Sequence, residues 1–131
     1  MRRGELARAT GCHPESIRYY ERIGLLREPP RSHGNQRIYD RSDLARASFI
    51  AGARAVGISI ENIRELLSMM DDGTVTCSKV RSRAVAHRDA LRREIGDLSR
   101  VVAQLDQVIG RCDGNESPSC PIVHDLAKGI R

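Results

Sequence analysis

The sequence predicts a mainly α-helical chain, with several short helices in its first part and one long helix in its second. Glycines at positions 11, 24 and 57 suit short helices that end in a left-handed residue. Between Ser78 and Gly110 there is no proline, and apolar residues recur every three or four positions. With 131 residues, the chain suits one small domain with an appended helix.

The first two predicted helices have the pattern of a helix-turn-helix. A short helical run containing Glu5 ends near Gly11, where glycine stops a helix. Pro14 then starts a second run, because proline fits the first helical position, and this run stops at Gly24. Two short helices joined by a few residues that include glycine are typical of this motif.

A small hairpin is predicted next. The Pro-Pro pair at 29–30 excludes a helix. The sequence HGN at 33–35 is a turn signal, and RIY at 37–39 can form a short strand. We therefore expect a hairpin that lies beside the helix-turn-helix as a wing.

Two further short helices follow the hairpin. Asp40 or Ser42 can cap a third helix over roughly 42–56. Ser59 can cap a fourth, and it must do so alone, because Asn62 stands where a capping box needs Glu or Gln.

The long predicted helix has the pattern of a coiled-coil seam of more than four heptads. At 1.5 Å per residue it is roughly 45–50 Å long, which exceeds what a small domain can cover. Its apolar stripe therefore needs a partner, most simply the same helix of a second copy in a homodimer. The seam positions are Val80, Ala84, His87, Leu91, Ile95, Leu98, Val102, Leu105 and Ile109.

Charge is distributed unevenly along the chain. Residues 1–57 carry 11 arginines and six acidic residues, a local net charge of +5, whereas residues 58–131 are neutral. Such asymmetry is typical of a part that meets a polyanion such as nucleic acid, and charge alone equally fits a basic surface with no partner. We find no nucleophile–base signature, phosphate-binding loop or HExxH motif, so an enzyme has little support.

The sequence favours a cytoplasmic protein with no membrane contact. It has no run of eighteen apolar residues, and the first residues, MRRGELARATG, lack the apolar stretch of a signal peptide. Four cysteines in a cytosolic chain more often indicate metal or redox chemistry than disulfides.

Three of these cysteines bracket the long helix. Cys77 precedes it, while Cys112 and Cys120 close a short loop after it. Thiolates prefer soft or borderline metals, and in a pair of chains the two ends of the helix can meet. The pattern predicts a metal site that spans two chains, with a thiol redox switch as the rival hypothesis. Cys12 lies in the helix-turn-helix turn and is expected to be a small buried residue.

The chain resembles the MerR family of transcription regulators over nearly its whole length. The resemblance rests on GELA-x-x-TG-C, SIRYYERIGLL, R-S-x-GN-x-R-IY and IRELL, followed by the long helix. It implies a homodimer with an antiparallel coiled coil, in which each subunit places a winged helix-turn-helix on half of a palindromic promoter. Inducer binding then distorts the DNA so that RNA polymerase can use the promoter.

The resemblance divides the chain into residues 1–72 for DNA binding, 73–110 for dimerisation and 111–131 for metal binding. Arginines on the second helix and beside the turn of the hairpin suit contacts with phosphates or guanine. Tyr19 and Tyr39 could instead pack in the core, since one of two adjacent helical tyrosines must face inward. The expected DNA contacts are Arg18, Tyr19, Tyr20, Arg31, Asn35, Arg37, Tyr39 and Arg54.

Within the family, a cysteine pair after the dimer helix marks the metal-responsive branch. The loop from Cys112 to Cys120 is similar to that of copper(I) sensors, in which two thiolates bind a monovalent ion linearly. The residue before the dimer helix is serine in those sensors but is Cys77 here, as in sensors of Zn, Cd, Pb and Hg. Those sensors add a third thiolate from the partner subunit.

Ligand count favours a soft divalent ion (Cd, Pb, Hg or Zn) over copper(I), silver or gold, because three thiolates offset more of its charge. The expected metal ligands are Cys112 and Cys120 of one chain and Cys77 of the partner subunit. His124 is a possible extra ligand, and Asp113, Glu116, Ser117 or water are alternatives.

Overall fold

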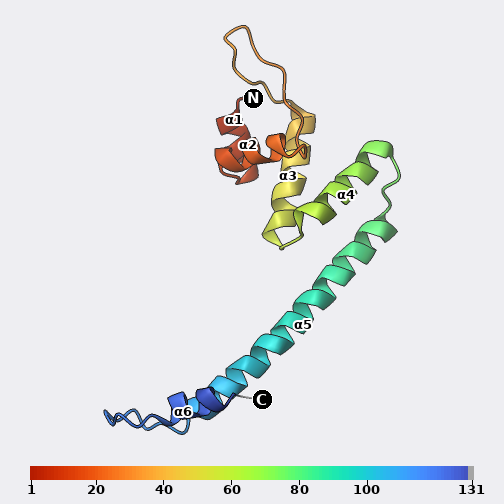
Figure 1. Ribbon diagram of the computed structural model, residues 1–131. Coiled ribbons are helices and arrows are strands. Elements are labelled where there is room, and N and C mark those ends of the chain that lie inside the picture. The colour runs from red at the N-terminus through yellow and green to blue at the C-terminus, as the bar shows by residue number, and fades with distance from the viewer. Residues whose placement is uncertain (130–131) are drawn as a thin grey trace. The chain divides into compact units, whose positions relative to one another are not determined.

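The computed structural model describes residues 1–129, and this part of the chain contains six α-helices and no regular strand (Figure 1). The mainly helical fold is therefore confirmed. The chain divides into two compact units, Met1–Val80 and Arg81–Arg131. The helices are α1 (Arg3–Thr10), α2 (Pro14–Arg22), α3 (Arg41–Ala55), α4 (Ile60–Asp72), α5 (Cys77–Ile109) and α6 (Pro121–Lys128).

The helix-turn-helix is formed by α1 and α2. α1 ends and α2 starts as predicted, and α2 ends at Arg22, shortly before the predicted stop at Gly24. α1 stops at Gly11, whose φ of 73° is a left-handed conformation that side chains other than glycine rarely adopt. Pro14 occupies the first turn of α2, and the preceding His13 caps the helix by accepting a hydrogen bond from Glu15 N at 3.1 Å. α1 packs against both α2 and α3, which fixes the orientation of α2 within this unit.

The core of the first unit is aliphatic and draws on all four of its complete helices. α1 contributes Leu6, α2 contributes Ile17, and α3 contributes Ile50, each with no exposed surface. Burying such a side chain stabilises the fold by about 1.5–3 kcal/mol relative to leaving it in water. The largest side chains with less than 2% exposure are Leu6, Ile17, Leu25, Ile50, Ile63 and Leu67.

Because Ile50 lies at the centre of this core, its replacement by Ala is expected to lower the free energy of unfolding by about 2–5 kcal/mol. Urea denaturation of the full chain, followed by circular dichroism, measures this loss. Ser48→Ala on the exposed side of the same helix is the control, and a change within about 0.5 kcal/mol is expected for it. Equal losses in the two variants would contradict the assignment of the core.

The segment between α2 and α3 forms a turn closed by one antiparallel bridge, between Arg31 and Arg37. Ser32 N donates to Gln36 O at 2.7 Å, and Asn35 adopts a left-handed φ of 60° at the tip. The predicted turn is confirmed, but the short strand expected at 37–39 is reduced to this single bridge. The proline pair opposite has no N–H groups to donate, so the ladder cannot extend. We call residues 30–38 the hairpin.

Polar caps start α3 and α4. Asp40, rather than Ser42, caps α3: its carboxylate accepts from Asp43 N at 3.0 Å, and Asp43 accepts from Asp40 N at 2.8 Å. Hydrogen bonds from the Ser42 hydroxyl and from Asp43 N lower the pKa of Asp40 to about 2. Ser59 caps α4 through Asn62 N at 3.2 Å, which confirms that it acts without a capping box.

A single arginine of α3 links the loop after α2 to the end of α4. Arg46 Nε donates to Leu25 O at 2.6 Å, and its two terminal nitrogens lie 2.7 and 3.2 Å from the carboxylate oxygens of Asp71. Asp71 stands in the last turn of α4, shortly before Cys77. This bidentate pair therefore connects the helix-turn-helix with the approach to α5.

The second unit comprises most of α5, the cysteine loop (residues 111–120) and α6. Seam residues of α5 are exposed in the single chain, with Ile95 and Leu98 each at 63%. Figure 1 shows α6 beside the C-terminal end of α5, with the loop projecting from it. Arg111 and Asp125 form an ion pair at 2.8 Å that closes the loop. No helix within residues 1–129 is long and apolar enough to cross a membrane.

Candidate nucleic-acid interface and cysteine loop

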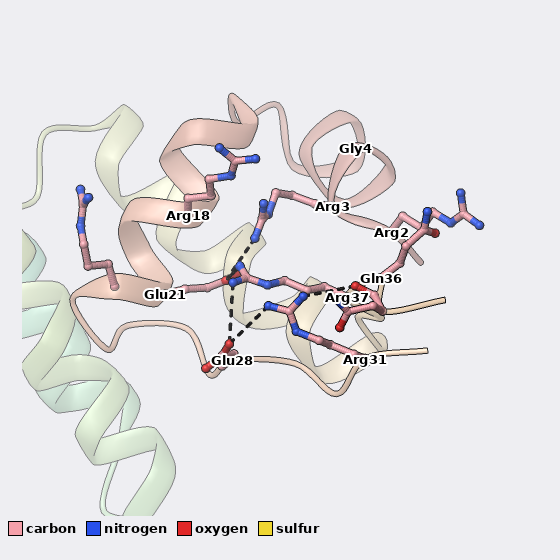
Figure 2. Close-up of a pocket in the computed structure, with 11 residues that line it drawn as sticks. Arg2, Arg3, Gly4, Arg18, Glu21, Glu28, Arg31, Gln36 and Arg37 are labelled. Carbon is pink, nitrogen blue, oxygen red and sulfur yellow. Dashed lines mark hydrogen bonds and ion pairs between the residues drawn. The ribbon is translucent and has the colours of Figure 1, made fainter. Parts of the chain in front are cut away.

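Six arginines surround an open hollow of about 770 Å³ between the start of α1, the exposed side of α2 and the hairpin (Figure 2). Three segments that are far apart in sequence supply them, and the fold gathers these six guanidinium groups on one surface. We call these residues the basic face: Arg2, Arg3, Arg18, Arg22, Arg31 and Arg37. Such a concentration of guanidinium groups suits a polyanion, because each group can form paired hydrogen bonds with phosphate oxygens.

On α2 the two adjacent tyrosines face in different directions. Tyr19 is 41% exposed, and the guanidinium of Arg22 lies over its ring at 5.5 Å from the centroid. Tyr20 packs against the core, and this burial raises the pKa of its hydroxyl. Arg18 is exposed and pairs with Glu15 at 2.9 Å. Of these three predicted contacts, Arg18 and Tyr19 are accessible, whereas Tyr20 mainly supports the helix.

The hairpin presents its predicted contacts at its turn. Arg31 Nη1 donates to Asn35 O at 3.2 Å, which folds the arginine back over the turn. Asn35 is exposed at the tip, and Arg37 is partly exposed at the far end of the bridge. All three residues line the hollow.

Tyr39 requires a correction, because the structure places it in the core with 2% exposure instead of on the surface. Its hydroxyl donates to Glu21 Oε1 and accepts from Arg3 Nε at 3.3 Å. Burial, followed by the hydrogen bond to Glu21, raises the pKa of Tyr39 to about 12, so the hydroxyl stays protonated at neutral pH. Tyr39 therefore supports Glu21 and Arg3 from the core.

Arg54 lies at the end of α3, apart from the residues that line the hollow. Its Nη1 donates to Ile58 O at 2.9 Å, across the turn that follows the helix. Its guanidinium also lies near Tyr20, where it lowers the pKa of that hydroxyl against the larger effect of burial. DNA contact by Arg54 remains a prediction.

Sequence reasoning missed several residues at this surface. Arg2, Arg3 and Gln36 line the hollow, and Glu21 lies beneath it, but none was among the expected contacts. Local charge in the sequence could have identified these residues. Arg2 immediately precedes α1 and Arg3 is its first residue, and Glu21 is an acidic residue within a strongly basic segment.

The cysteine loop is held by hydrogen bonds between residues two positions apart. Cys112 Sγ accepts from Gly114 N at 3.4 Å, Asp113 accepts from Asn115 N at 3.1 Å, and Asn115 accepts from Ser117 N at 2.8 Å. Asp113 and Ser117 are thus already engaged within the loop.

The thiols lie at the ends of these elements. Cys112 and Cys120 are half-buried, and Cys120 immediately precedes Pro121, the first residue of α6. Cys77 is exposed at the first position of α5, and His124 is exposed on α6. All four cysteines are free thiols. Within residues 1–129 of one chain, no three His, Cys, Asp or Glu side chains lie close enough together to hold a metal ion.

Cys12 differs from the other three cysteines, as expected. It is half-buried in the turn between α1 and α2 and packs against the core. Its backbone N–H donates to Thr10 Oγ1 at 3.4 Å, which stabilises the turn.

Several relatives of this chain carry names of metal-dependent or metal-resistance regulators. It is 34% identical over 129 residues to "Heavy metal-dependent transcription regulator 2" of Rhizobium meliloti, covering 98% of this chain and 88% of the relative. It is 36% identical to the "Mercuric resistance operon regulatory protein" of Shigella flexneri, covering 94% of this chain and 85% of the relative.

A solved structure is similar over almost the same extent. The transcription regulator PbrR691 from Ralstonia metallidurans CH34, in complex with lead(II), has a TM-score of 0.82 and 36% identity. The match covers 96% of this chain and 98% of that chain.

Two family models match the sequence. "MerR HTH family regulatory protein" matches residues 1–70, and "MerR, DNA binding" matches residues 44–108. Together with the relatives, these matches cover both the helix-turn-helix and the long helix. The chain therefore belongs to the MerR family of helix-turn-helix transcription regulators, which bind DNA and are not enzymes.

Proposed function

We propose that the chain is a metal-responsive transcription regulator that binds a palindromic promoter as a homodimer. On binding a soft divalent ion (Cd, Pb, Hg or Zn), it activates genes for metal resistance or efflux. The observation that carries this proposal is the position of the three thiols, at the two ends of a long helix with an exposed apolar stripe, in a DNA-binding chain.

The basic face supports the DNA-binding half of the proposal. Its exposed guanidinium groups are suited to backbone phosphates, which fix the position and orientation of the protein on the duplex. Arg18 and Tyr19 lie on the exposed side of α2, the helix that we expect to enter the major groove.

Replacement of Arg18 by Ala is expected to weaken DNA binding and to reduce the slope of log affinity against log salt by about 1, because one phosphate or base contact is lost. Fluorescence anisotropy at several salt concentrations measures the slope. The probe is a duplex that the wild-type protein selects from a randomised pool. Arg92→Ala removes the same charge from an exposed position on α5 and should leave the slope unchanged. An unchanged slope for Arg18→Ala would remove this residue from the interface.

The seam of α5 supports the homodimer. Leu91, Ile95, Leu98 and Val102 are 40–63% exposed in the single chain, which is unfavourable for large apolar side chains in water. A second copy of the helix, packed in antiparallel orientation, would cover this stripe and bring the start of one α5 toward the end of the other.

The donor set supports a shared metal site. One chain contributes Cys112 and Cys120, and Cys77 of the partner subunit supplies the third thiolate. His124 remains a candidate fourth ligand for an ion such as Zn²⁺ that prefers four donors. Three thiolates suit soft divalent ions. The bound ion would fix the loop against the partner, and this change would distort the promoter so that RNA polymerase can use it.

Two alternative functions are compatible with the same residues. Copper(I), silver or gold could bind Cys112 and Cys120 alone in a linear site, and a thiol redox switch would need no metal. Anaerobic titration of reduced protein with Cd, Pb, Hg, Zn and copper(I), with transcription from the selected promoter as the second readout, separates them. Tight divalent binding that activates transcription is expected. Failure to bind any of these ions, with output that follows oxidation, would favour the redox switch.

A further inference from the structure

Glu21 lies beneath the centre of the basic face, although its charge is opposite to that of the face. Its side chain is 6% exposed. An ionised carboxylate is costly to bury unless it is paired and hydrogen-bonded, so its partners must offset that cost. These partners are residues of the basic face itself, which gives the buried charge a role at the DNA surface.

The contacts of Glu21 join α2 to two other segments. Oε2 lies 2.5 Å from Arg37 Nη1 of the hairpin and 3.5 Å from Arg3 Nη2 of α1. Oε1 accepts the hydroxyl hydrogen of Tyr39, which also accepts from Arg3 Nε at 3.3 Å. Tyr39 N in turn donates to Met1 O at 2.7 Å, which holds the start of the chain against the end of the hairpin.

Arg3 is engaged through Nε and Nη2, by Tyr39 and Glu21, and Arg37 through Nη1 and Nη2, by Glu21 and Glu28. A guanidinium has five N–H donors in a planar fork, and these contacts use some of them. Arg37 directs Nη1 to Glu21 and Nη2 toward Glu28 at 3.7 Å, and its side chain remains 26% exposed. Figure 2 shows the Glu21 side chain extending from α2, with Arg3 reaching it from α1 and Arg37 reaching it from the hairpin, beside the hollow that these residues line. The exposed parts of Arg37 (26% of the side chain) and of Arg3 (18%) remain accessible to a ligand in that hollow, whereas Arg3 Nη2 is buried.

Without Glu21 these two guanidinium groups would repel each other and regain rotamer freedom. A mobile arginine must be ordered when it binds a phosphate, and this ordering opposes binding. Arg3 Nη2 is buried with no hydrogen-bond partner among the described residues, so the nearby carboxylate is what offsets its charge. The carboxylate of Glu21 therefore holds the side chains of Arg3 and Arg37 in fixed positions before DNA binds.

We propose that Glu21 is a positioning residue, which holds Arg3 and Arg37 as a preorganised clamp for adjacent backbone phosphates and so sets the register of α2 on its specific site. This inference rests on the proposed DNA-binding function of the basic face. Glu21 acts through the two arginines and does not itself touch DNA, because a carboxylate would be repelled by phosphate.

The variant Glu21→Gln distinguishes a positioning role from a charge effect, because the two predict opposite changes in affinity for the specific duplex. The variant makes the first unit more positive by one charge, so electrostatics alone predicts tighter binding to every duplex. Loss of positioning instead predicts weaker binding to the specific duplex, where geometry matters. Binding to a scrambled duplex is expected to be unchanged or stronger, because it depends on charge and tolerates mobile side chains.

The experiment measures anisotropy with two probes, a duplex selected by the wild-type protein from a randomised pool and a scrambled duplex of the same composition. We expect the ratio of specific to nonspecific affinity to fall by roughly 5- to 100-fold in Glu21→Gln, since two side chains must then be ordered on binding. Tighter binding to both probes with an unchanged ratio would overturn the proposal.

Glu28→Gln is the matched control for charge. Glu28 is 69% exposed and lies 3.7 Å from Arg37 and 3.9 Å from Arg31, so it does not hold either arginine rigidly. The Glu28→Gln variant therefore removes one negative charge near the same surface without loss of a buried contact. We expect it to strengthen binding to both probes and to preserve the ratio. A fall in the ratio as large as that of Glu21→Gln would show that charge near the face, and not the buried clamp, sets specificity.

Thermal unfolding and circular dichroism check the fold of each variant. If Glu21→Gln fails to fold, Tyr39→Phe provides the second test, because it removes the hydroxyl that contacts Glu21 and Arg3 while retaining the buried ring. A smaller fall in the same ratio is expected, and an unchanged ratio would contradict the clamp. Failure of the wild-type protein to select any duplex would instead refute the proposed function.

Discussion

Replacement of Cys112 by Ser is expected to lower the affinity for Cd, Pb and Hg by at least about 100-fold and to remove metal-dependent transcription. Loss of a supporting hydrogen bond to a metal ligand already costs 10- to 100-fold, and loss of the ligand itself must cost more. A hydroxyl oxygen is a poor substitute for a thiolate toward soft ions. Anaerobic competition titration against a chelator of known affinity measures the change.

Cys77→Ser separates the divalent proposal from the copper(I) alternative. If Cys77 of the partner subunit is the third ligand, its loss should remove most of the divalent response and largely spare copper(I) affinity. Cys12→Ala is the control, since this half-buried thiol packs against the core and should not change metal affinity. Equal losses of divalent and copper(I) affinity in Cys77→Ser would show that this residue has another role.

Replacement of Leu98 by Asp is expected to convert the proposed homodimer to monomers at micromolar concentration. Leu98 is 63% exposed in the single chain, and burial of such a side chain against a partner contributes about 1.5–3 kcal/mol. A twofold dimer loses this contribution twice, so its dissociation constant should rise by 100-fold or more, on the order of 3 kcal/mol at least. Analytical ultracentrifugation over a concentration series measures the change.

The same variant should also lose high-affinity divalent binding, because each site would lack the thiolate of the partner subunit. Ser99→Asp introduces the same charge at the neighbouring exposed position off the seam, and it should remain dimeric and metal-responsive. Divalent binding of wild-type strength by a Leu98→Asp monomer would mean that a single chain completes the site.

Local elements of this fold could be predicted closely, because the forces that set them act within a few residues. Gly11 ends α1 since only a left-handed residue satisfies that terminus, and Ser59 starts α4 through a bond to Asn62 N. The seam spacing likewise predicts α5 to within a residue or two, from Cys77 to Ile109. The hairpin was less predictable, because its pairing depends on a partner segment that the prolines at 29–30 deprive of donors.

The cysteine site could be predicted more completely than the basic face, because the chemistry of a thiol is visible in the sequence whereas the exposure of a side chain is not. Thiols are rare and chemically distinctive, so Cys77, Cys112 and Cys120 could be named from spacing and family resemblance. At the basic face, sequence reasoning named Arg18 and Arg37, expected Tyr39 as a DNA contact with core packing as the alternative, and omitted Arg3. Whether a tyrosine faces the core or the solvent depends on which helices pack against it, and α1 and α3 lie far from each other in sequence.

The sequence by itself determined the helix order, the helix-turn-helix, the basic character of the first part and the family, because capping, periodicity and charge are properties of neighbouring residues. Only the tertiary structure decided that Tyr20 and Tyr39 lie inward and that Glu21 joins Arg3 to Arg37. That junction brings together residues 3, 21, 37 and 39, whose mutual distances are set by core packing. A buried carboxylate beneath a basic surface therefore becomes visible only when the packed helices fix those distances.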